Sequence, residues 1–376
     1  MHVADIESLE VFLNEKKVGT LALDDRNLVV FEYDPKWIET GFSISPLSLP
    51  LRPGLFAPKN PLLFDGLSGV FADSLPDGWG QLLTDRMLRE KGIVPESLTV
   101  LQRLSILGNS GKGALEYRPV WLLENAVDSR KSLDELAEAV QEILNGSSSD
   151  NLDVLYDHAG SSGGARPKVN ITLDNEEWIV KFPASTDLKN VCQMEYDYHQ
   201  CAKACGLRVA ETKLFPSDRC SGYFASRRFD RNSTEKIHMI SVSGLLETSH
   251  RIPSLDYDLL LKLTWLLTRS REEVWQMFSL MCFNVFAHNR DDHSNNFSFL
   301  YLQDHWELAP AYDLTWSNSM GGEHATMIHG NGKDPDMEEL LAAADQAGLD
   351  LQEAAERAES IRQRTEKELG IYLKWS

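Results

Sequence analysis

The stretch His288-Asn-Arg-Asp-Asp-His-Ser-Asn-Asn296 is the part of this 376-residue sequence from which fold and chemistry are best argued. It follows an apolar run of helical length and precedes a strand-like run, so it forms a loop between two buried elements. Within it, Asp291 and Asn296 stand five positions apart. Phosphoryl transfer to a hydroxyl needs a carboxylate to receive the proton and oxygen ligands for a divalent cation. The stretch is therefore a candidate catalytic loop.

A second carboxylate follows at Asp313, after the strand-like run Trp306-Glu-Leu308. Mg²⁺ prefers oxygen donors and needs few protein ligands, so Asn296 and Asp313 are the expected metal ligands, with Asp291 as the catalytic base. Asp, Asn and His also gather in ordinary turns, where they hydrogen-bond the local backbone. Either motif alone is equally consistent with a turn, whereas the two in order favour catalysis.

The same loop admits one other chemical interpretation. A metal cluster of an HD-type phosphohydrolase would use His288, Asp291, Asp292 and His293. Sites of that kind require further His and Asp ligands on other helices, and no such set stands out in the sequence. Phosphoryl transfer remains the favoured interpretation.

Two upstream segments supply candidate nucleotide contacts. Ser161-Ser-Gly-Gly-Ala-Arg-Pro-Lys168 is a glycine-containing turn whose N–H groups can approach phosphate oxygens, and its lysine adds charge. Lys181 lies in the apolar run Trp178-Ile-Val-Lys-Phe182, where burial is costly without a partner. A nucleotide phosphate is one such partner, and Glu195 on the next predicted helix is another. A flexible hairpin and a solvent-facing edge lysine are the alternatives.

The patterning divides the chain into three parts. Residues 1–125 carry alternating strand-like runs and a proline-rich stretch, which is expected to be loop or edge strand. Residues 126–230 alternate strands with a glycine turn and a helix, as in a mixed α/β small lobe, and residues 231–376 are mostly helical. The predicted fold class is α+β: a kinase-like two-lobed fold with an N-terminal β-rich subdomain.

Local signals give several element boundaries. Ser132-Leu-Asp-Glu135 is a capping box, which predicts a helix from Leu133. Further helices are expected over Gln81–Lys91 and over Asn190–Cys205, the latter ending at Gly206. A strand is expected over Glu116–Leu122.

Taken together, these segments resemble the HipA family of bacterial toxin kinases. The resemblance runs over most of the chain and is firmest in Ser161–Lys168, Trp178–Pro183, Glu195–Gly206, Arg228-Phe-Asp-Arg231, His288–Phe297 and Ala311-Tyr-Asp-Leu-Thr315. Near the N-terminus, Phe71-Ala-Asp-Ser-Leu-Pro-Asp-Gly-Trp-Gly80 is similar to the N-terminal part of that family.

The resemblance implies roles for individual residues. It makes Asp291 the catalytic base and Asn296 and Asp313 the Mg²⁺ ligands. Ser161, or alternatively Ser162, falls where the family autophosphorylates a serine at the head of its phosphate loop. The residues implied to bind ATP are Gly163, Gly164, Ala165, Arg166, Pro167, Lys168, Lys181, Arg227, Arg228, Phe229, His293, Ser294, Asn295, Asn296, Tyr312 and Asp313.

The resemblance also implies an activity and partners. The expected protein is an ATP- and Mg²⁺-dependent serine/threonine protein kinase, the toxin of a type II toxin–antitoxin system. Its expected partners are a helix-turn-helix antitoxin or repressor and a translation-related protein substrate such as an aminoacyl-tRNA synthetase. Autophosphorylation of the phosphate loop is expected to inactivate it. Two alternatives stay open: a non-catalytic corepressor subunit of such a repressor, and a kinase for a small molecule.

Composition and charge limit which binding partners and which cellular compartment are expected for this protein. A formal net charge of −20 disfavours direct binding to nucleic acid, so DNA is expected only through the antitoxin. The first residues lack the pattern of a signal peptide, and the most apolar run, Val274–Ala287, is short and interrupted by polar residues. Five cysteines without zinc-site spacing indicate free thiols in a reducing compartment. A cytoplasmic protein without membrane association is expected.

Overall fold

The computed structural model describes residues 6–26, 28–123, 131–146, 152–159, 164–184, 187–188, 190–232, 235–249, 254–318 and 320–374. Ser161, Ser162 and Gly163, which carry predicted roles, lie outside the described residues. The helices are α1 (Pro35–Thr40), α2 (Gly69–Ala72), α3 (Gly78–Glu90), α4 (Val100–Leu107), α5 (Leu133–Leu144), α6 (Leu152–Ala159), α7 (Val191–Ala204), α8 (Val242–Leu246), α9 (Tyr257–Thr268), α10 (Arg271–Phe286), α11 (Met337–Gln346) and α12 (Leu351–Leu373). The strands are β1 (Ser8–Leu13), β2 (Lys16–Leu23), β3 (Val29–Tyr33), β4 (Leu55–Phe56), β5 (Leu115–Arg118), β6 (Lys168–Leu173), β7 (Glu176–Lys181), β8 (Thr212–Phe215), β9 (Tyr223–Arg227), β10 (His238–Ser241), β11 (Leu255–Asp256), β12 (Ser298–Leu302), β13 (His305–Leu308) and β14 (Thr326–Met327).

The N-terminal sheet is antiparallel throughout, with strand order β4-β3-β2-β1-β5. Alternate residues of β1, Leu9 and Val11, face the core, which is the pattern of a half-buried strand. β4 is an edge strand within the proline-rich stretch, as predicted. β5 ends at Arg118 rather than at the predicted Leu122, because Pro119 has no N–H to continue the ladder.

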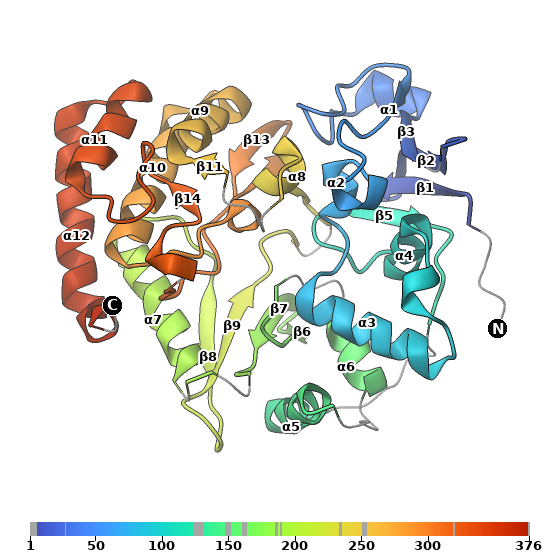
Figure 1. Cartoon of the computed structure of the whole chain (residues 1–376), viewed down its shortest axis with the longest axis horizontal. Coiled ribbons are helices and arrows are strands. Elements are labelled where there is room, and N and C mark those ends of the chain that lie inside the picture. Colours follow the sequence, from blue (N-terminus) through green and yellow to red (C-terminus); the bar gives the residue numbers. More distant parts are fainter. Residues whose placement is uncertain are drawn as a thin grey trace.

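The sheet of the small lobe is also antiparallel, with strand order β6-β7-β9-β8, and α7 lies beside it (Figure 1). Trp178 and Val180 of β7 are fully buried, as their apolar strand predicts. α7 is followed by Gly206 in the left-handed conformation that favours glycine, so the predicted helix end is confirmed.

Helices α9, α10 and α12 make up most of the large lobe, and the antiparallel sheet β10-β12-β13 lies beside them (Figure 1). Ser270 caps α10 by accepting the N–H of Glu273. α10 is then buried on almost every side, which suits its apolar sequence. In the described part of the chain, no helix is both long enough and apolar enough to span a membrane.

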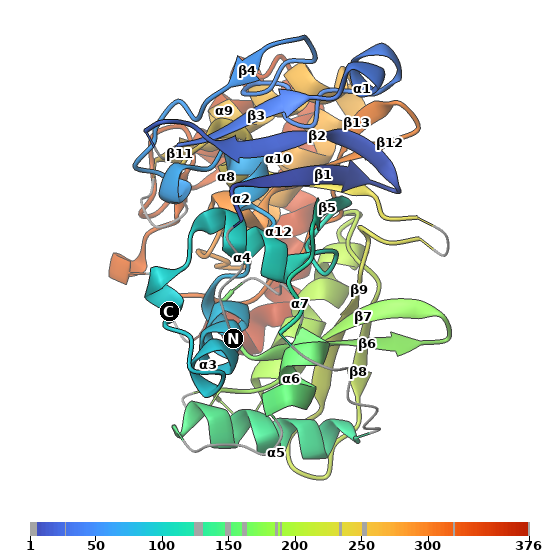
Figure 2. The same cartoon turned by 90° about the vertical axis from the view of Figure 1, so that its right-hand side faces the viewer.

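The N-terminal region packs against both lobes. Its sheet shares one hydrophobic core with the large lobe, whereas Trp79, Leu83 and Met87 of α3 belong to the core of the small lobe. Figure 2 shows this split, with β1 to β4 at one end of the molecule and α3 next to α6 nearer the other. α3 begins at Gly78, earlier than the predicted Gln81. The proposed divisions near residues 125 and 230 stay predictions.

Candidate active site

Lys181, the last residue of β7, is the centre of the candidate site. It is 7% exposed, and its ammonium donates to Glu195 on α7 and to Asp313 on the loop after β13. Burial by itself lowers the pKa of a lysine, but the two carboxylates outweigh burial and raise the pKa of Lys181. Lys181 is therefore held as a cation between the two lobes, with the predicted partner Glu195.

Asp313 is the acidic end of this bridge. Its backbone is left-handed, with φ 53°, a conformation that Asp tolerates better than most residues. Burial favours its neutral form, but Lys181 and Lys168 outweigh burial and hold its pKa well below the ordinary value. Its side chain is still 38% exposed, so an ionised carboxylate is accessible beside the lysines.

Lys168 lies directly opposite Lys181 in the β6–β7 register. It is 6% exposed, and burial together with the charge of Lys181 lowers its pKa to about 8, although Asp313 acts in the other direction. Arg166, two residues earlier, bonds Asp187 at 3.1 Å and Glu195 at 3.3 Å. The two lysines thus form a cationic pair, while the Arg166 side chain is engaged by carboxylates of the small lobe.

The loop His288–Asn296 turns its two adjacent aspartates in opposite directions. Asp292 is buried and accepts from the Tyr257 hydroxyl and from the backbone N–H groups of Ala325 and Thr326. Asp291 instead has a side chain 58% exposed. The buried aspartate therefore anchors the loop, and the exposed one is left accessible to solvent.

The carboxyl group of Asp291 has a raised pKa. Partial desolvation raises its pKa above the ordinary value, and the charges of Asp313 and Asp292 act in the same direction, while His293 opposes them. The His293 Nε2 lies 3.7 Å from Asp291 Oδ1.

Tyr312 joins the loop of Asp313 to the loop His288–Asn296, whereas Asn296 bonds within its own loop. The Asn296 side-chain amide donates to the Asp291 carbonyl at 2.7 Å, which leaves its oxygen as the atom suited to a cation. The Tyr312 hydroxyl donates to the Asn295 carbonyl at 2.5 Å and lies 2.6 Å from the Ser298 hydroxyl. Asp313 directly follows Tyr312, and Asn296 directly follows Asn295. Each expected metal ligand is therefore next to one end of the Tyr312–Asn295 hydrogen bond. Oxygen donors on these two loops fit a magnesium ion.

The segment after β9 has less freedom than the sequence suggests. The N–H of Arg227 donates to the Glu211 carbonyl and that of Arg228 to the Glu177 carbonyl, both at 2.8 Å. The Phe229 ring packs near Tyr312, with ring centroids 5.6 Å apart. Of the three predicted positions in this segment, Phe229 is therefore the one placed toward the loop of Tyr312 and Asp313.

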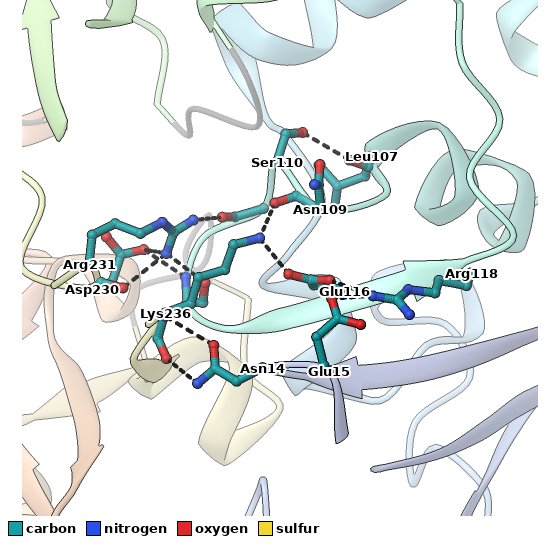
Figure 3. A network of polar contacts seen from close by, with 12 residues as sticks. Asn14, Glu15, Leu107, Asn109, Ser110, Glu116, Arg118, Asp230, Arg231 and Lys236 are labelled. Atoms are coloured by element: carbon teal, nitrogen blue, oxygen red, sulfur yellow. Dashed lines mark hydrogen bonds and ion pairs between the residues drawn. The ribbon is translucent and has the colours of Figure 1, made fainter. Parts of the chain in front are cut away.

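The side chains beyond Phe229 face the N-terminal region. Asp230 accepts from both nitrogens of the Arg228 fork at 2.9 and 2.7 Å, from Arg231 at 2.9 Å and from the Gly113 N–H at 2.8 Å. Lys236 adds contacts to the Asn109 carbonyl and to Glu116 on β5 (Figure 3). This network fixes the connection between the lobes to the N-terminal region, so the Arg228 guanidinium is committed there.

The alternative metal cluster is not formed. Within the residues that the structure describes, no three His, Cys, Asp or Glu side chains converge as a group suited to a metal ion. Asp292, one of its four candidate ligands, is bonded inward to Tyr257 and, at 3.0 Å, to His324. The five cysteines are free thiols, as predicted.

Sequence reasoning missed one part of this neighbourhood. Asp77 and Trp79, at the start of α3, contact the described end of the phosphate-loop segment: Asp77 accepts the Gly164 N–H, and Trp79 bonds the carbonyls of Gly164 and Lys168. The only signal was an aspartate followed by Gly-Trp-Gly before a helical run. That pattern is equally typical of an ordinary helix start.

A strand lysine that joins a helix glutamate of the small lobe to an aspartate of a helical lobe places this protein among kinase-like folds. Sequence comparison identifies the family. Residues 160–369 match the HipA-like C-terminal domain and residues 9–118 match the HipA N-terminal domain. The chain belongs to the HipA family, as the sequence motifs predicted.

One solved structure supports the fold. HipA of Shewanella oneidensis MR-1, determined with HipB and operator DNA, superposes with a TM-score of 0.68 at 18% identity, covering 96% of this chain and 97% of that one. The Helicobacter pylori proinflammatory kinase CtkA gives a TM-score of 0.37 at 15% identity, covering 54% and 89% respectively. No functionally curated protein matches the sequence significantly.

Proposed function

We propose that this protein is an ATP- and Mg²⁺-dependent serine/threonine protein kinase. The observation that carries the proposal is the Lys181 bridge, in which one buried ammonium meets Glu195 and Asp313. In a nucleotide complex, an ammonium held by Glu195 is aimed at phosphate oxygens. Lys168 adds a second cation on the adjacent strand, so the arrangement suits a polyphosphate better than a singly charged ligand.

Asn296 and Asp313 would hold Mg²⁺, which would neutralise phosphate charge during transfer. Asp313 suits this role because Lys181 and Lys168 keep it ionised despite burial. Asp291 would accept the hydroxyl proton of the substrate serine or threonine. Its raised pKa makes it a better proton acceptor than an ordinary aspartate.

The adenine would lie against the segment after β9. Since the N–H groups of Arg227 and Arg228 already bond the carbonyls of Glu211 and Glu177, we assign the adenine contact in this segment to the backbone of Phe229. The Phe229 and Tyr312 rings would border the base. Ser294 is buried, so it would support this side of the site through the loop backbone, whereas the half-buried His293 and Asn295 would contact the nucleotide directly.

Ser161 is the proposed autophosphorylation site, with Ser162 as the alternative. A phosphate there would bring about −1.5 to −2 charge units into the segment that must receive the ATP phosphates, so it would inactivate the enzyme. Intact-mass measurement of Ser161→Ala and Ser162→Ala after incubation with ATP identifies the acceptor. If both variants still gain the phosphate, the assignment is wrong.

The proposed biological role is that of a cytoplasmic toxin held by a helix-turn-helix partner. The HipA of Shewanella oneidensis was solved with HipB and its operator DNA, which motivates the same class of partner here. The formal net charge of −20 favours contact with DNA through that partner rather than directly. A translation-related protein, such as an aminoacyl-tRNA synthetase, is the proposed substrate. Phosphoproteomic comparison of cells with and without induction would identify it.

A measurement of nucleotide binding tests the role proposed for the Lys181 bridge. Lys181→Met should weaken ATP binding at least tenfold, about 1.4 kcal/mol, because it removes the cation from both carboxylates and from the phosphates. Isothermal titration with MgATP measures this change. Lys213→Met is the matched control, since Lys213 lies on β8 of the same sheet and contacts the Trp178 ring. Equal binding by wild type and Lys181→Met would refute the proposed site.

A further inference from the structure

Asp77 occupies the N-cap position of α3, yet its side chain does not cap that helix. An N-cap aspartate usually accepts an N–H from the first turn of its own helix. Here its Oδ1 accepts the N–H of Gly164, which lies 87 positions away in the sequence. The carboxylate is therefore directed at the described end of the phosphate-loop segment.

The same carboxylate faces the cationic side of the proposed phosphate site. Gly164 has φ +88°, and a Cβ built on it would lie 3.1 Å from the Lys168 Nζ, so the ammonium is beside this glycine. Asp77 is among the charges that favour the protonated form of Lys168. A backbone N–H beside an ammonium is a donor set that phosphate oxygens use. Asp77 thus occupies, as an internal anion, donors that a phosphate would need.

The contact is built into the start of α3. The Trp79 N–H donates to the Gly164 carbonyl at 3.1 Å, and the Trp79 indole donates to the Lys168 carbonyl at 3.0 Å. Gly78 has φ +45°, and a Cβ there would lie 2.4 Å from the Gly164 carbonyl oxygen. Only a glycine at position 78 permits this approach, so the helix start and Gly164 are held together by more than one exposed hydrogen bond.

We propose that Asp77 competes with the phosphates of the nucleotide for the Gly164 N–H and for the charge of Lys168, and thereby sets the affinity for polyphosphate ligands. The inference rests on the proposed nucleotide site. One N–H cannot serve two anions at full strength, and a carboxylate and a phosphate that share these donors repel each other. Removing the charge of Asp77 should strengthen the binding of phosphates, although it removes a contact seen in the protein.

Titration of Asp77→Asn and Asp77→Ser with MgATP, MgADP and adenosine near pH 7 tests this competition. Asn and Ser both suit an N-cap, so α3 keeps its start while the charge is lost. Both variants should bind ATP roughly three- to tenfold more tightly than wild type. The gain should be smaller for ADP and absent for adenosine. It should also shrink as salt rises from about 0.05 to 0.5 M, because the competing interaction is between charges.

Asp85→Asn is the control on the same helix, because Asp85 pairs with Arg103 at 3.0 Å and does not contact Gly164; its ATP affinity should equal that of wild type. Unchanged or weaker ATP binding by both Asp77 variants overturns the competition, and so does an equal gain for adenosine. Inorganic tripolyphosphate, which carries no base or sugar, separates this inference from the proposed function. Tighter tripolyphosphate binding by the variants supports the competition even if wild type fails to bind ATP.

Discussion

At the scale of single residues, Lys168 should make the proposed binding of nucleotide dependent on pH. Its pKa of about 8 lies below the ordinary 10.5, so the side chain is charged below pH 8 and loses its proton as pH rises through 8. Above that pH, Lys168 must take up a proton before its ammonium can pair with a bound phosphate. The affinity of wild type for MgATP should therefore fall above pH 8, by up to about tenfold per pH unit, in titrations between about pH 7 and 9.5.

Lys168→Met is the companion variant for that titration. It has no proton to lose at this position, so its weaker ATP binding should be almost flat over the same pH range. Parallel curves for wild type and Lys168→Met would show that the pH dependence arises elsewhere.

Side-chain contacts were predictable where burial of a charge requires a partner. A lysine in the apolar run of β7 needs a partner, and Glu195 and Asp313 supply it. The engagement of Arg228 was not predicted, because its N–H bonds the carbonyl of Glu177, which is distant in the sequence, and its guanidinium pairs with Asp230, which is bonded in turn to the N-terminal region. Asp77 was missed for a related reason: its partner is distant in the sequence.

At the scale of elements, the packing of α2 against α8 depends on glycine. A Cβ on Gly69 would lie 2.1 Å from the Gly244 carbonyl oxygen, and both residues are in buried helices that cannot separate without loss of core contacts. Gly69→Ala should therefore lower the free energy of unfolding by about 1–3 kcal/mol or more. Urea denaturation followed by fluorescence measures the change.

Gly370→Ala in α12 is the matched control for Gly69→Ala. No atom lies within 4 Å of a Cβ built at Gly370, and the residue is inside a helix. Alanine there should raise stability by up to about 1 kcal/mol. Equal destabilisation by the two substitutions would contradict the close α2–α8 contact.

Elements were predictable where their signals are local. The capping box of Ser132 and Glu135 begins α5 as expected, because both bonds form within one turn. α4 has the same kind of cap at Thr99 and Gln102 but was not anticipated, since its short run is apolar on nearly every side. The contact between α2 and α8 joins segments that are far apart in the sequence. Local sequence patterns therefore do not predict it.

At the scale of the whole molecule, the Asp230 network should make the attachment of the N-terminal region sensitive to acid. Burial favours the neutral acid, but Arg228 and Arg231 outweigh burial and lower the pKa of Asp230 from 3.8 to about 2, which corresponds to about 2 kcal/mol. This stability is fully present well above pH 3.8 and is lost as pH falls through the folded-state pKa near 2. Denaturant unfolding of wild type between about pH 7 and 2.5 measures the loss.

Asp230→Asn tests the assignment of that acid sensitivity. At pH 7 this substitution should lower the free energy of unfolding by about 3–5 kcal/mol, because two buried arginines lose their counter-charge. The difference in free energy of unfolding between wild type and Asp230→Asn should become smaller as pH falls below about 4. Asp304→Asn, in the exposed β12–β13 turn, should match wild type at every pH. A gap for Asp230→Asn that stays constant with pH would contradict the account.

The two-lobed fold and the family were predictable from ordered motifs, whereas the way the N-terminal region joins the lobes was not. That region contributes α3 to one core and its sheet to another, and it holds both Asp230 and Gly164. Such contacts depend on three-dimensional packing of segments far apart in the sequence. They connect the N-terminal region to the candidate site in the kinase-like lobes.

Phosphoryl transfer tests the central claim most directly. Wild type incubated with ATP and Mg²⁺ should gain phosphate, measured by intact mass and by phosphopeptide mapping. Asp291→Asn should reduce that gain at least 10²-fold, because the group that receives the hydroxyl proton is lost. Asp304→Asn makes the same chemical change in an exposed turn and should retain wild-type transfer. Phosphate incorporation by Asp291→Asn at the wild-type rate would contradict the account.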